Sequence, residues 1–385
     1  MLIYISILLL FLLMFLVSRN RQIDKKFAFV SICILILLAG FKYRVGSDAL
    51  LYQDIYEQYP TLNQLSINYI LNSRWGSLFV IWFSLCHTLF HDFIYYQFIH
   101  AIILLSSVYL LIKHYTKMLM PAILMFSIVQ YLFMTFDLYR EGLAAAIYFF
   151  SIPFLEKKKY LIYYAFCFIC FNIHVSSFLC FFVPLIAKVN LLKWTYKPFL
   201  IFFVLSFFAS LIIVPIVNLI PITSVRILAL SYLGKGIEVE GMTFTRAIFV
   251  IVIYYFGIYK NIKFFNDKNI LVLNLAYLSL LIETLQKGIP FVFRLNSYFS
   301  IFLVIGLAIT IERYISVETN RTFYIDKYIK VLLIILLYSG PKILDYMKSE
   351  GTYNAYFPYV SVFNPHIISK REFHDINDYL RYDQK

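Results

Sequence analysis

Charged residues are scarce in this chain. Of its 385 residues, only 14% are Asp, Glu, Lys or Arg, whereas 62% are hydrophobic. Soluble domains carry roughly 25% charged residues, so the composition excludes an ordinary soluble protein. We therefore predict a polytopic integral membrane protein with an all-α fold.

Cysteine is also rare, with five residues that all lie inside apolar runs. A thiol in such surroundings behaves as a small hydrophobic group, so we expect neither a disulfide framework nor a metal cluster. Cys167 and Cys170 have CxxC spacing, but no second pair accompanies them. Buried packing is therefore the preferred interpretation of this pair.

Several catalytic signatures are missing. The chain has no GxxxxGK[ST] nucleotide loop, no HExxH zinc helix and no GxSxG elbow. We expect no metal and no cofactor. The net charge of +13 is spread through loops and the tail, which indicates membrane topology and gives no reason to expect a nucleic-acid partner.

The apolar runs predict about twelve membrane crossings, within a range of about 10 to 13, when spans of about 20 residues are sought and shorter ones allowed. They lie near residues 2–18, 27–41, 93–112, 118–136, 139–155, 160–173, 174–187, 198–221, 244–259, 269–286, 290–311 and 328–341. Short cytoplasmic loops hold an excess of Lys and Arg, which places both termini outside. Residues 1–341 then form a single transmembrane domain with outer loops 42–76 and 222–243, and 342–385 form a polar tail on the outer face.

Two stretches do not fit this scheme simply. Residues 77–90 are apolar enough to cross the membrane, but a crossing there would put the lysine run 157–159 outside. We interpret 77–90 as a re-entrant or interfacial helix, with Trp75 and Trp82 near the headgroups. Residues 160–187 are interpreted as two short helices that meet at an outer apex; the alternative is one long, tilted helix with His174 buried halfway.

Polar residues interrupt the apolar pattern at a few places. A cluster from Lys42 to Tyr52, which contains Arg44 and Asp48, directly follows the second apolar segment. Three further basic residues lie in or beside apolar runs, namely Arg140, His174 and Arg294. Such residues are costly in a membrane unless they face a polar cavity or a bound anion. All of them fall on the outer side, so we expect the helices to surround an outward-facing polar cavity.

These positions also carry a family resemblance. Tyr43-Arg44-Val45-Gly46-Ser47-Asp48, followed by Tyr52, resembles the Arg-x-Gly-Thr/Ser-Asp-x-x-x-Tyr signature of the EpsG family of Wzy-type polysaccharide polymerases. Four later segments resemble further elements of that family, in the same order. They are Tyr139-Arg140-Glu141-Gly142-Leu143-Ala144, Asn172-Ile173-His174-Val175-Ser176-Ser177, Phe293-Arg294-Leu295-Asn296-Ser297-Tyr298 and Tyr356-Phe357-Pro358-Tyr359. Glu141-Gly142 replaces the usual Gln and its neighbour, which leaves the role of Glu141 open.

The resemblance implies glycosyl transfer on the outer face of the bacterial inner (cytoplasmic) membrane. The substrates would be undecaprenyl-diphosphate-linked oligosaccharide repeat units. The growing glycan would move from one carrier onto the non-reducing end of a new unit, to make O-antigen, capsule or exopolysaccharide. Membrane lipids and a chain-length regulator are the partners that the resemblance implies.

Roles for the polar residues follow from this chemistry. Arginines hold phosphate oxygens bidentately and neutralise the charge that grows on a leaving diphosphate. We assign diphosphate or substrate binding to Arg44, Arg140, Arg294, Tyr52 and Tyr298. The attacking hydroxyl must lose a proton to a base within hydrogen-bond reach, for which Asp48 is the first candidate and His174 the second.

Other interpretations stay open. Arg44 and Asp48 are spaced as a helix-end ion pair, Arg140 has Asp137 and Glu141 as nearby acidic partners, and His174 fits a hydrogen bond to a neighbouring helix. A lipid-linked oligosaccharide flippase or other transporter would need similar cations, although residues 1–190 show no repeat in 191–385. An O-antigen ligase would act on overlapping substrates.

Overall fold

The computed structural model describes residues 2–18, 20–188, 250–255, 270–285, 293–316 and 355–366, with the single positions 197, 200, 201, 204, 259, 335, 339 and 340. Over these residues the fold is helical, and the strand-like pairing in them is one antiparallel bridge between Lys42 and Ser361. The all-α prediction is confirmed for this part. The expected outer loop 222–243 and most of the expected spans 198–221, 244–259 and 328–341 lie outside the described residues.

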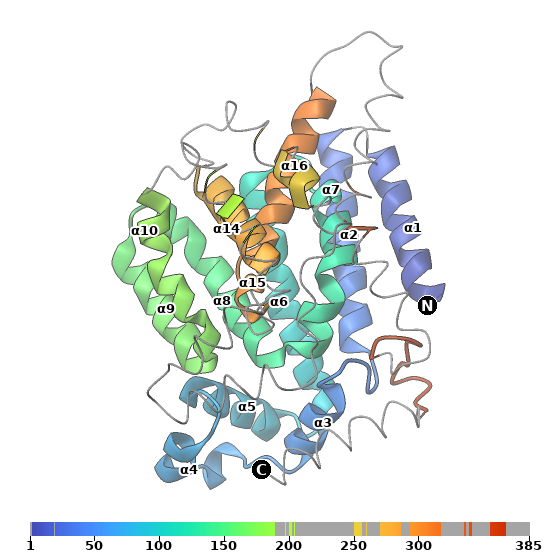
Figure 1. The fold of residues 1–385 in the computed structure, drawn as a ribbon. Coiled ribbons are helices and arrows are strands. Elements are labelled where there is room, and N and C mark those ends of the chain that lie inside the picture. The colour runs from blue at the N-terminus through green and yellow to red at the C-terminus, as the bar shows by residue number, and fades with distance from the viewer. Residues whose placement is uncertain are drawn as a thin grey trace. The chain divides into compact units, whose positions relative to one another are not determined.

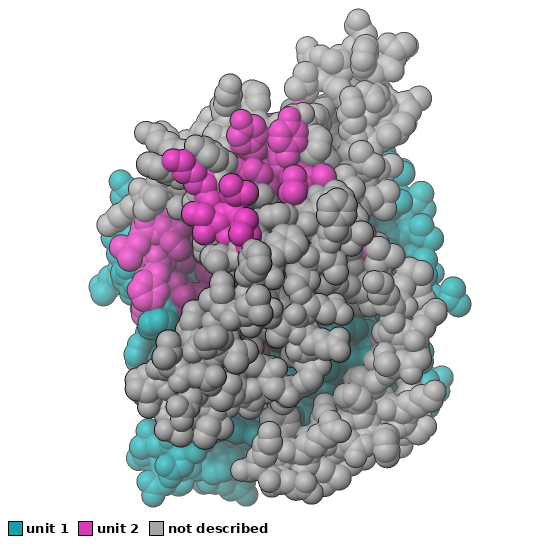
Figure 2. All heavy atoms as spheres, viewed as in Figure 1, with its two compact units in different colours: residues 1–178, 342–385 teal, residues 179–341 magenta. Residues whose placement is uncertain are grey.

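The chain divides into two compact units (Figure 2), of which the first comprises residues 1–178 and 342–385 and the second residues 179–341. Its helices, labelled in Figure 1 where room allows, are α1 (Leu2–Val17), α2 (Arg21–Gly40), α3 (Ala49–Glu57), η1 (Leu62–Gln64), α4 (Ile67–Asn72), α5 (Ser77–Leu89), α6 (Phe93–Tyr115), α7 (Met120–Val129), η2 (Phe133–Asp137), α8 (Tyr139–Glu156), α9 (Tyr160–Ile173), η3 (Val175–Phe182), α10 (Val183–Lys188), α14 (Ile270–Leu285), α15 (Phe293–Asn296) and α16 (Ser300–Ser316). The positions of α1, α2, α6, α8 and α9 agree with those of expected spans.

Helix α6 is central to the first unit. It packs against α2 and α8, while α9 packs on α8 and α1 packs on α7. Its Leu104, Leu105 and Val108 are buried against these neighbours, whereas Ile102 and Leu110 point outward. A helix that is apolar on its outer face as well as its inner face suits a lipid environment.

By length and composition, α6 is the one helix among the described residues that could cross a membrane by itself. Shorter apolar helices cover Leu2–Val17, Ser77–Leu89, Met120–Val129, Tyr160–Ile173, Val175–Ala187 and Ile270–Thr284. The membrane assignment and the number of about twelve crossings therefore stay predictions.

The two stretches with open interpretations are both helical. Residues 77–90 form α5, which lies with α3 and α4 at one end of the long helices of this unit (Figure 1). In the other stretch, α9 ends at Ile173, and His174 has extended backbone with φ −149° and ψ 125°. This break excludes the single long helix, because the chain continues from His174 into η3 and α10.

The second unit is described around α14, which packs on α10, α15 and α16. Ser279 on α14 donates a hydrogen bond to Asn296 Oδ1 at the end of α15, across 2.8 Å. Asn274, also on α14, donates to the carbonyl of Ile186 on α10, across 3.2 Å. The first bond holds α15, which carries Arg294, against α14, and the second joins α14 to α10.

Candidate functional site

The loop that follows α2 begins the site. Gly46 has φ +120°, which side-chain-bearing residues rarely adopt. A Cβ on this glycine would lie 2.4 Å from the carbonyl oxygen of Phe136. Glycine is therefore required here, because the loop lies directly against η2, a π-helical turn between α7 and α8. π-Helical turns are frequent at functional sites.

Lys42 reaches from this loop into the interior and is fully buried. Its Nζ donates hydrogen bonds to the carbonyls of Thr135, across 3.0 Å, and Phe136, across 3.3 Å. The ammonium also lies 4.2 Å from the ring centroid of Phe136 and 4.8 Å from that of Tyr139. Burial lowers the pKa of Lys42 to about 7, against the attraction of the Asp137 carboxylate.

Asp137, the last residue of η2, joins three parts of the first unit. Its Oδ1 accepts a hydrogen bond from the backbone N–H of Ser47 across 2.7 Å, and its Oδ2 accepts one from the hydroxyl of Tyr356. Desolvation raises the pKa of this buried carboxyl, while the hydrogen bonds and Lys42 oppose the shift. The loop after α2 is thus fixed one residue before Asp48.

Arg140 lies in the first turn of α8. Its Nε donates a hydrogen bond to the hydroxyl of Tyr52 on α3 across 2.7 Å, and its guanidinium carbon lies 5.3 Å from the ring centroid of Trp75. Among the described residues, no other hydrogen bond or ion pair engages its terminal amino groups. The alternative of a pairing with Asp137 or Glu141 is not seen, because the hydrogen-bond partner of Arg140 in the described residues is Tyr52.

Three aromatic rings form the support behind Arg140. Tyr52 stacks on Trp75 at a centroid distance of 5.9 Å with 12° between the planes, and Tyr59 stacks on Trp75 at 5.6 Å and 16°. All three are buried. Their faces are occupied by one another and, at Trp75, by Arg140, so they orient Arg140 and are not open platforms for a sugar ring.

Asp48 directly precedes α3 and is exposed. Its carboxylate is near enough to Tyr139, the neighbour of Arg140, for an electrostatic interaction. Arg44, on the same loop, approaches Asp54 on α3 with 3.9 Å between nitrogen and oxygen, and both side chains are partly exposed. Such surface pairs are weak, so Arg44 can exchange this contact for an anion at little cost.

His174 follows the last residue of α9 and is largely buried. The backbone N–H of Ser176 donates to its Nδ1 across 3.4 Å, and the hydroxyl oxygen of Ser176 lies 2.6 Å from the same atom. When Nδ1 accepts the hydrogen bond from the Ser176 N–H, the neutral ring carries its hydrogen on Nε2 and can donate it from there. Ser176 is thus a local partner of His174.

The end of α9 also contacts the loop that carries Trp75. A Cβ on Gly76 would lie 2.1 Å from the carbonyl oxygen of Asn172, so the two segments touch through their backbones. The first unit contains five of the expected residues, namely Arg44, Asp48, Tyr52, Arg140 and His174, and within it Arg140 contacts Tyr52 directly. Arg294 and Tyr298 belong to the second unit, where Tyr298 is fully buried in a manner typical of packing.

A family model described as the EpsG family matches residues 25–361, nearly the whole chain. The chain belongs to the EpsG family. EpsG proteins are Wzy-like polysaccharide polymerases, so the resemblance seen in the five motifs is confirmed. No curated protein and no solved structure shows significant similarity to the chain.

Sequence reasoning missed three residues that organise the site of this EpsG protein: Lys42, Asp137 and Trp75. A signal for Asp137 is present, because it is a carboxylate next to an apolar run and three residues before Arg140. Burial of Lys42 and stacking of Trp75 leave no comparable mark in the sequence. Among the described residues, no group of three or more His, Cys, Asp or Glu side chains is placed to hold a metal ion.

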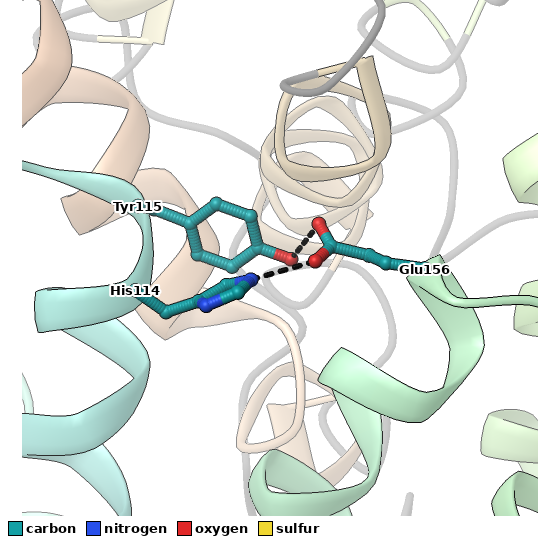
Figure 3. Close-up of polar contacts among 3 residues, drawn as sticks. All are labelled: His114, Tyr115 and Glu156. Atoms are coloured by element: carbon teal, nitrogen blue, oxygen red, sulfur yellow. Dashed lines mark hydrogen bonds and ion pairs between the residues drawn. The ribbon is translucent and has the colours of Figure 1, made fainter.

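A second polar cluster lies at the other end of α6 and α8 (Figure 3). His114 Nε2 is 2.6 Å from Glu156 Oε2, and the hydroxyl of Tyr115 donates to Glu156 Oε1 across 2.6 Å. Because α8 begins beside Arg140 and ends at Glu156, this cluster is separated from the candidate site by the length of the helix. It ties the two helices together and lies away from the residues assigned to the reaction.

Proposed function

We propose that this EpsG protein is a Wzy-type polymerase that joins undecaprenyl-diphosphate-linked oligosaccharide repeat units on the outer face of the bacterial cytoplasmic membrane. The observation that carries the proposal is the state of Arg140. Its Nε is fixed by Tyr52, while its terminal amino groups are uncommitted among the described residues, beside the loop of Asp48. A guanidinium fixed in this way suits two oxygens of a diphosphate.

The proposed reaction is a displacement at the anomeric carbon of the growing glycan. A hydroxyl oxygen of the incoming repeat unit forms the new glycosidic bond, and the bond from the anomeric carbon to the carrier phosphate breaks. The diphosphate leaves with the electron pair, and the hydroxyl proton passes to Asp48. Asp48 suits this role because it is exposed on a loop that Asp137 fixes one residue away.

Charge on the departing diphosphate is stabilised by arginine. Arg140 supplies an oriented pair of donors, and Arg44 supplies a second, partly exposed cation from the loop after α2. Arg294 is proposed as a third phosphate contact, and His174 as a hydrogen-bond donor to the substrate. A lipid carrier requires this site at the membrane surface, which supports a multi-pass location in the cytoplasmic membrane with bilayer lipids around the helices.

The test is the glycolipid pattern on a gel from cells that lack the gene. The cells are complemented with the intact chain, Asp48→Asn, Arg140→Ala or the control Asp54→Asn, which alters an exposed carboxylate on α3. We expect the intact chain and the control to restore a ladder, and the two site variants to leave core plus one repeat unit. Loss of the single-unit band as well would point to a flippase or ligase. A full ladder without the gene would overturn the proposal.

A further inference from the structure

The segment 355–366 lies beside the loop that follows α2 (Figure 1). The backbone N–H groups of Tyr43 and Gly46 donate to the carbonyls of Val360 and Ala355, each across 2.9 Å, and Val362 N–H donates to Phe41 O across 3.0 Å. These bonds lie on both sides of Lys42. Segment 355–366 therefore fixes the backbone of the loop that leads to Asp48.

Two tyrosines anchor this segment, and they do so at different places. The hydroxyl of Tyr359 donates to the carbonyl of Leu38 in α2 across 2.9 Å. The hydroxyl of Tyr356 donates to Asp137 Oδ2, whose partner oxygen accepts the N–H of Ser47. Tyr356 thus acts on the carboxylate that holds the Asp48 loop, whereas Tyr359 acts on a helix backbone.

The Asp137 carboxylate needs hydrogen-bond donors such as Tyr356, because it is buried and the nearby Lys42 amine donates elsewhere. Lys42 directs its Nζ hydrogens to the carbonyls of Thr135 and Phe136, so the carboxylate takes its hydrogen bonds from Ser47 and Tyr356. Hydrogen bonds to a buried carboxylate are stronger than those between neutral groups. Removal of one therefore lets the carboxylate shift and loosens its hold on Ser47.

We propose that Tyr356 is a positioning residue of the polymerase, which acts through Asp137 to set the Asp48 loop for proton transfer. This rests on the proposed function, in which Asp48 accepts the proton. Segment 355–366 is then a part of the catalytic site in its own right. It determines the rate of transfer, while diphosphate binding depends on Arg140.

The test compares two tyrosines in one segment. Tyr356→Phe and Tyr359→Phe each remove one hydroxyl, and both are purified in detergent and assayed with lipid-linked repeat units extracted from cells that lack the gene. We expect kcat of Tyr356→Phe to fall about tenfold, with KM within about twofold, because one charge-assisted hydrogen bond is lost. Tyr359→Phe should keep the kcat of the intact chain, and both variants should melt close to it.

A double variant separates positioning from a general loss of structure. Asp137→Asn alone should lower kcat, and Tyr356→Phe added to it should lower kcat no further, because the second change acts through the first. Equal loss in Tyr356→Phe and Tyr359→Phe, or additive loss in the double variant, overturns the inference. Asp48→Asn in the same assay tests the proposed function separately. If Asp48→Asn polymerises normally, the proposed function fails. If Asp48→Asn is inactive while Tyr356→Phe keeps the kcat of the intact chain, only the inference about Tyr356 fails.

Discussion

The Nε–H of Arg140 points at the hydroxyl of Tyr52, 2.7 Å away and 88 residues earlier in the chain. This bond fixes the plane of the guanidinium, and the face of Trp75 covers it. A lysine ammonium has neither a plane to fix nor two parallel donors. The site is thus built for arginine at this position, and not for positive charge alone.

Arg140→Lys should therefore lose polymerisation, although the substitution keeps the positive charge. We expect the polymer ladder to collapse to short products, because the bond to Tyr52 and the paired contact to phosphate are both lost. Arg74→Lys is the matched control, since Arg74 is exposed and also lies near Trp75, at 6.0 Å from its ring. A normal ladder from Arg140→Lys would contradict the orienting role of Tyr52.

Trp75→Leu should lower polymer yield, whereas Trp75→Phe should retain much of it, because a phenyl face still supports the guanidinium. Trp82→Leu, in α5, is the control for loss of a tryptophan near the same helix. The gel ladder and the amount of protein in the membrane are measured together. A similar loss in Trp75→Leu and Trp82→Leu would point to a general packing defect.

Gly46→Ala should abolish polymer formation. Its Cβ would lie 2.4 Å from a backbone oxygen that cannot move without η2, and the φ of +120° adds strain. Gly306→Ala, in α16, places its Cβ 3.5 Å from Ala276, which is an ordinary contact. We expect Gly306→Ala to behave as the intact chain; activity in Gly46→Ala would show that the loop can leave η2.

The stability of the purified protein should depend on pH through Lys42. Its pKa is about 7 in the folded protein against an ordinary 10.5, so between these values the unfolded chain binds a proton that the folded chain does not. The free energy of unfolding therefore rises with pH across this window, by on the order of 1 kcal/mol per pH unit from this group.

Melting curves in detergent from pH 7 to pH 10 test this dependence. Lys42→Met should lack the rise, whereas the exposed control Lys113→Met should keep it. Parallel pH profiles of the intact chain and Lys42→Met would show that the amine is charged in the folded state. At pH 10, where burial of the amine costs little, Lys42→Met should have the lower melting temperature, because two buried carbonyls lose their donor.

Glu156→Gln should separate stability from activity. The change weakens the contacts of His114 and Tyr115 at the far end of α8 (Figure 3), so the melting temperature should fall slightly while the ladder keeps its normal length. Partly exposed pairs contribute about 1 kcal/mol or less, which sets the expected size of the effect. A shortened ladder would show that this end of the helix matters for the reaction.

Sequence reasoning located the long helices of the first unit, because apolar runs are strong signals, and Arg44, Asp48, Arg140 and His174 all belong to that unit. It also placed a break at His174, where Asn172 and His174 interrupt the run. For Arg140 the sequence offers Asp137 and Glu141 as alternative acidic partners, since neighbours in sequence are the partners that a sequence displays. The partner in the structure is Tyr52, and only the packing of α3 on α5 and α6 brings it there.

The burial of the Lys42 side chain was not predictable, again because its partners are distant in sequence. A lysine at the end of an apolar segment usually extends to the interface, and its burial here depends on carbonyls that the π-helical turn exposes at Thr135 and Phe136. That turn follows from tertiary packing and has no simple sequence pattern. The partners of Asp137 are likewise distant in sequence, because its carboxylate accepts hydrogen bonds from Ser47 and Tyr356.

The link between Tyr356 and Asp137 spans 219 residues, and that between Tyr4 and Tyr356 spans 352. A ribosome makes the Asp48 loop early and Tyr356 long afterwards. While the chain is still being translated and inserted, the loop lacks the partner that holds its carboxylate in place. Under the proposed function, a nascent chain therefore lacks the contact that positions Asp48 until residue 356 has been made.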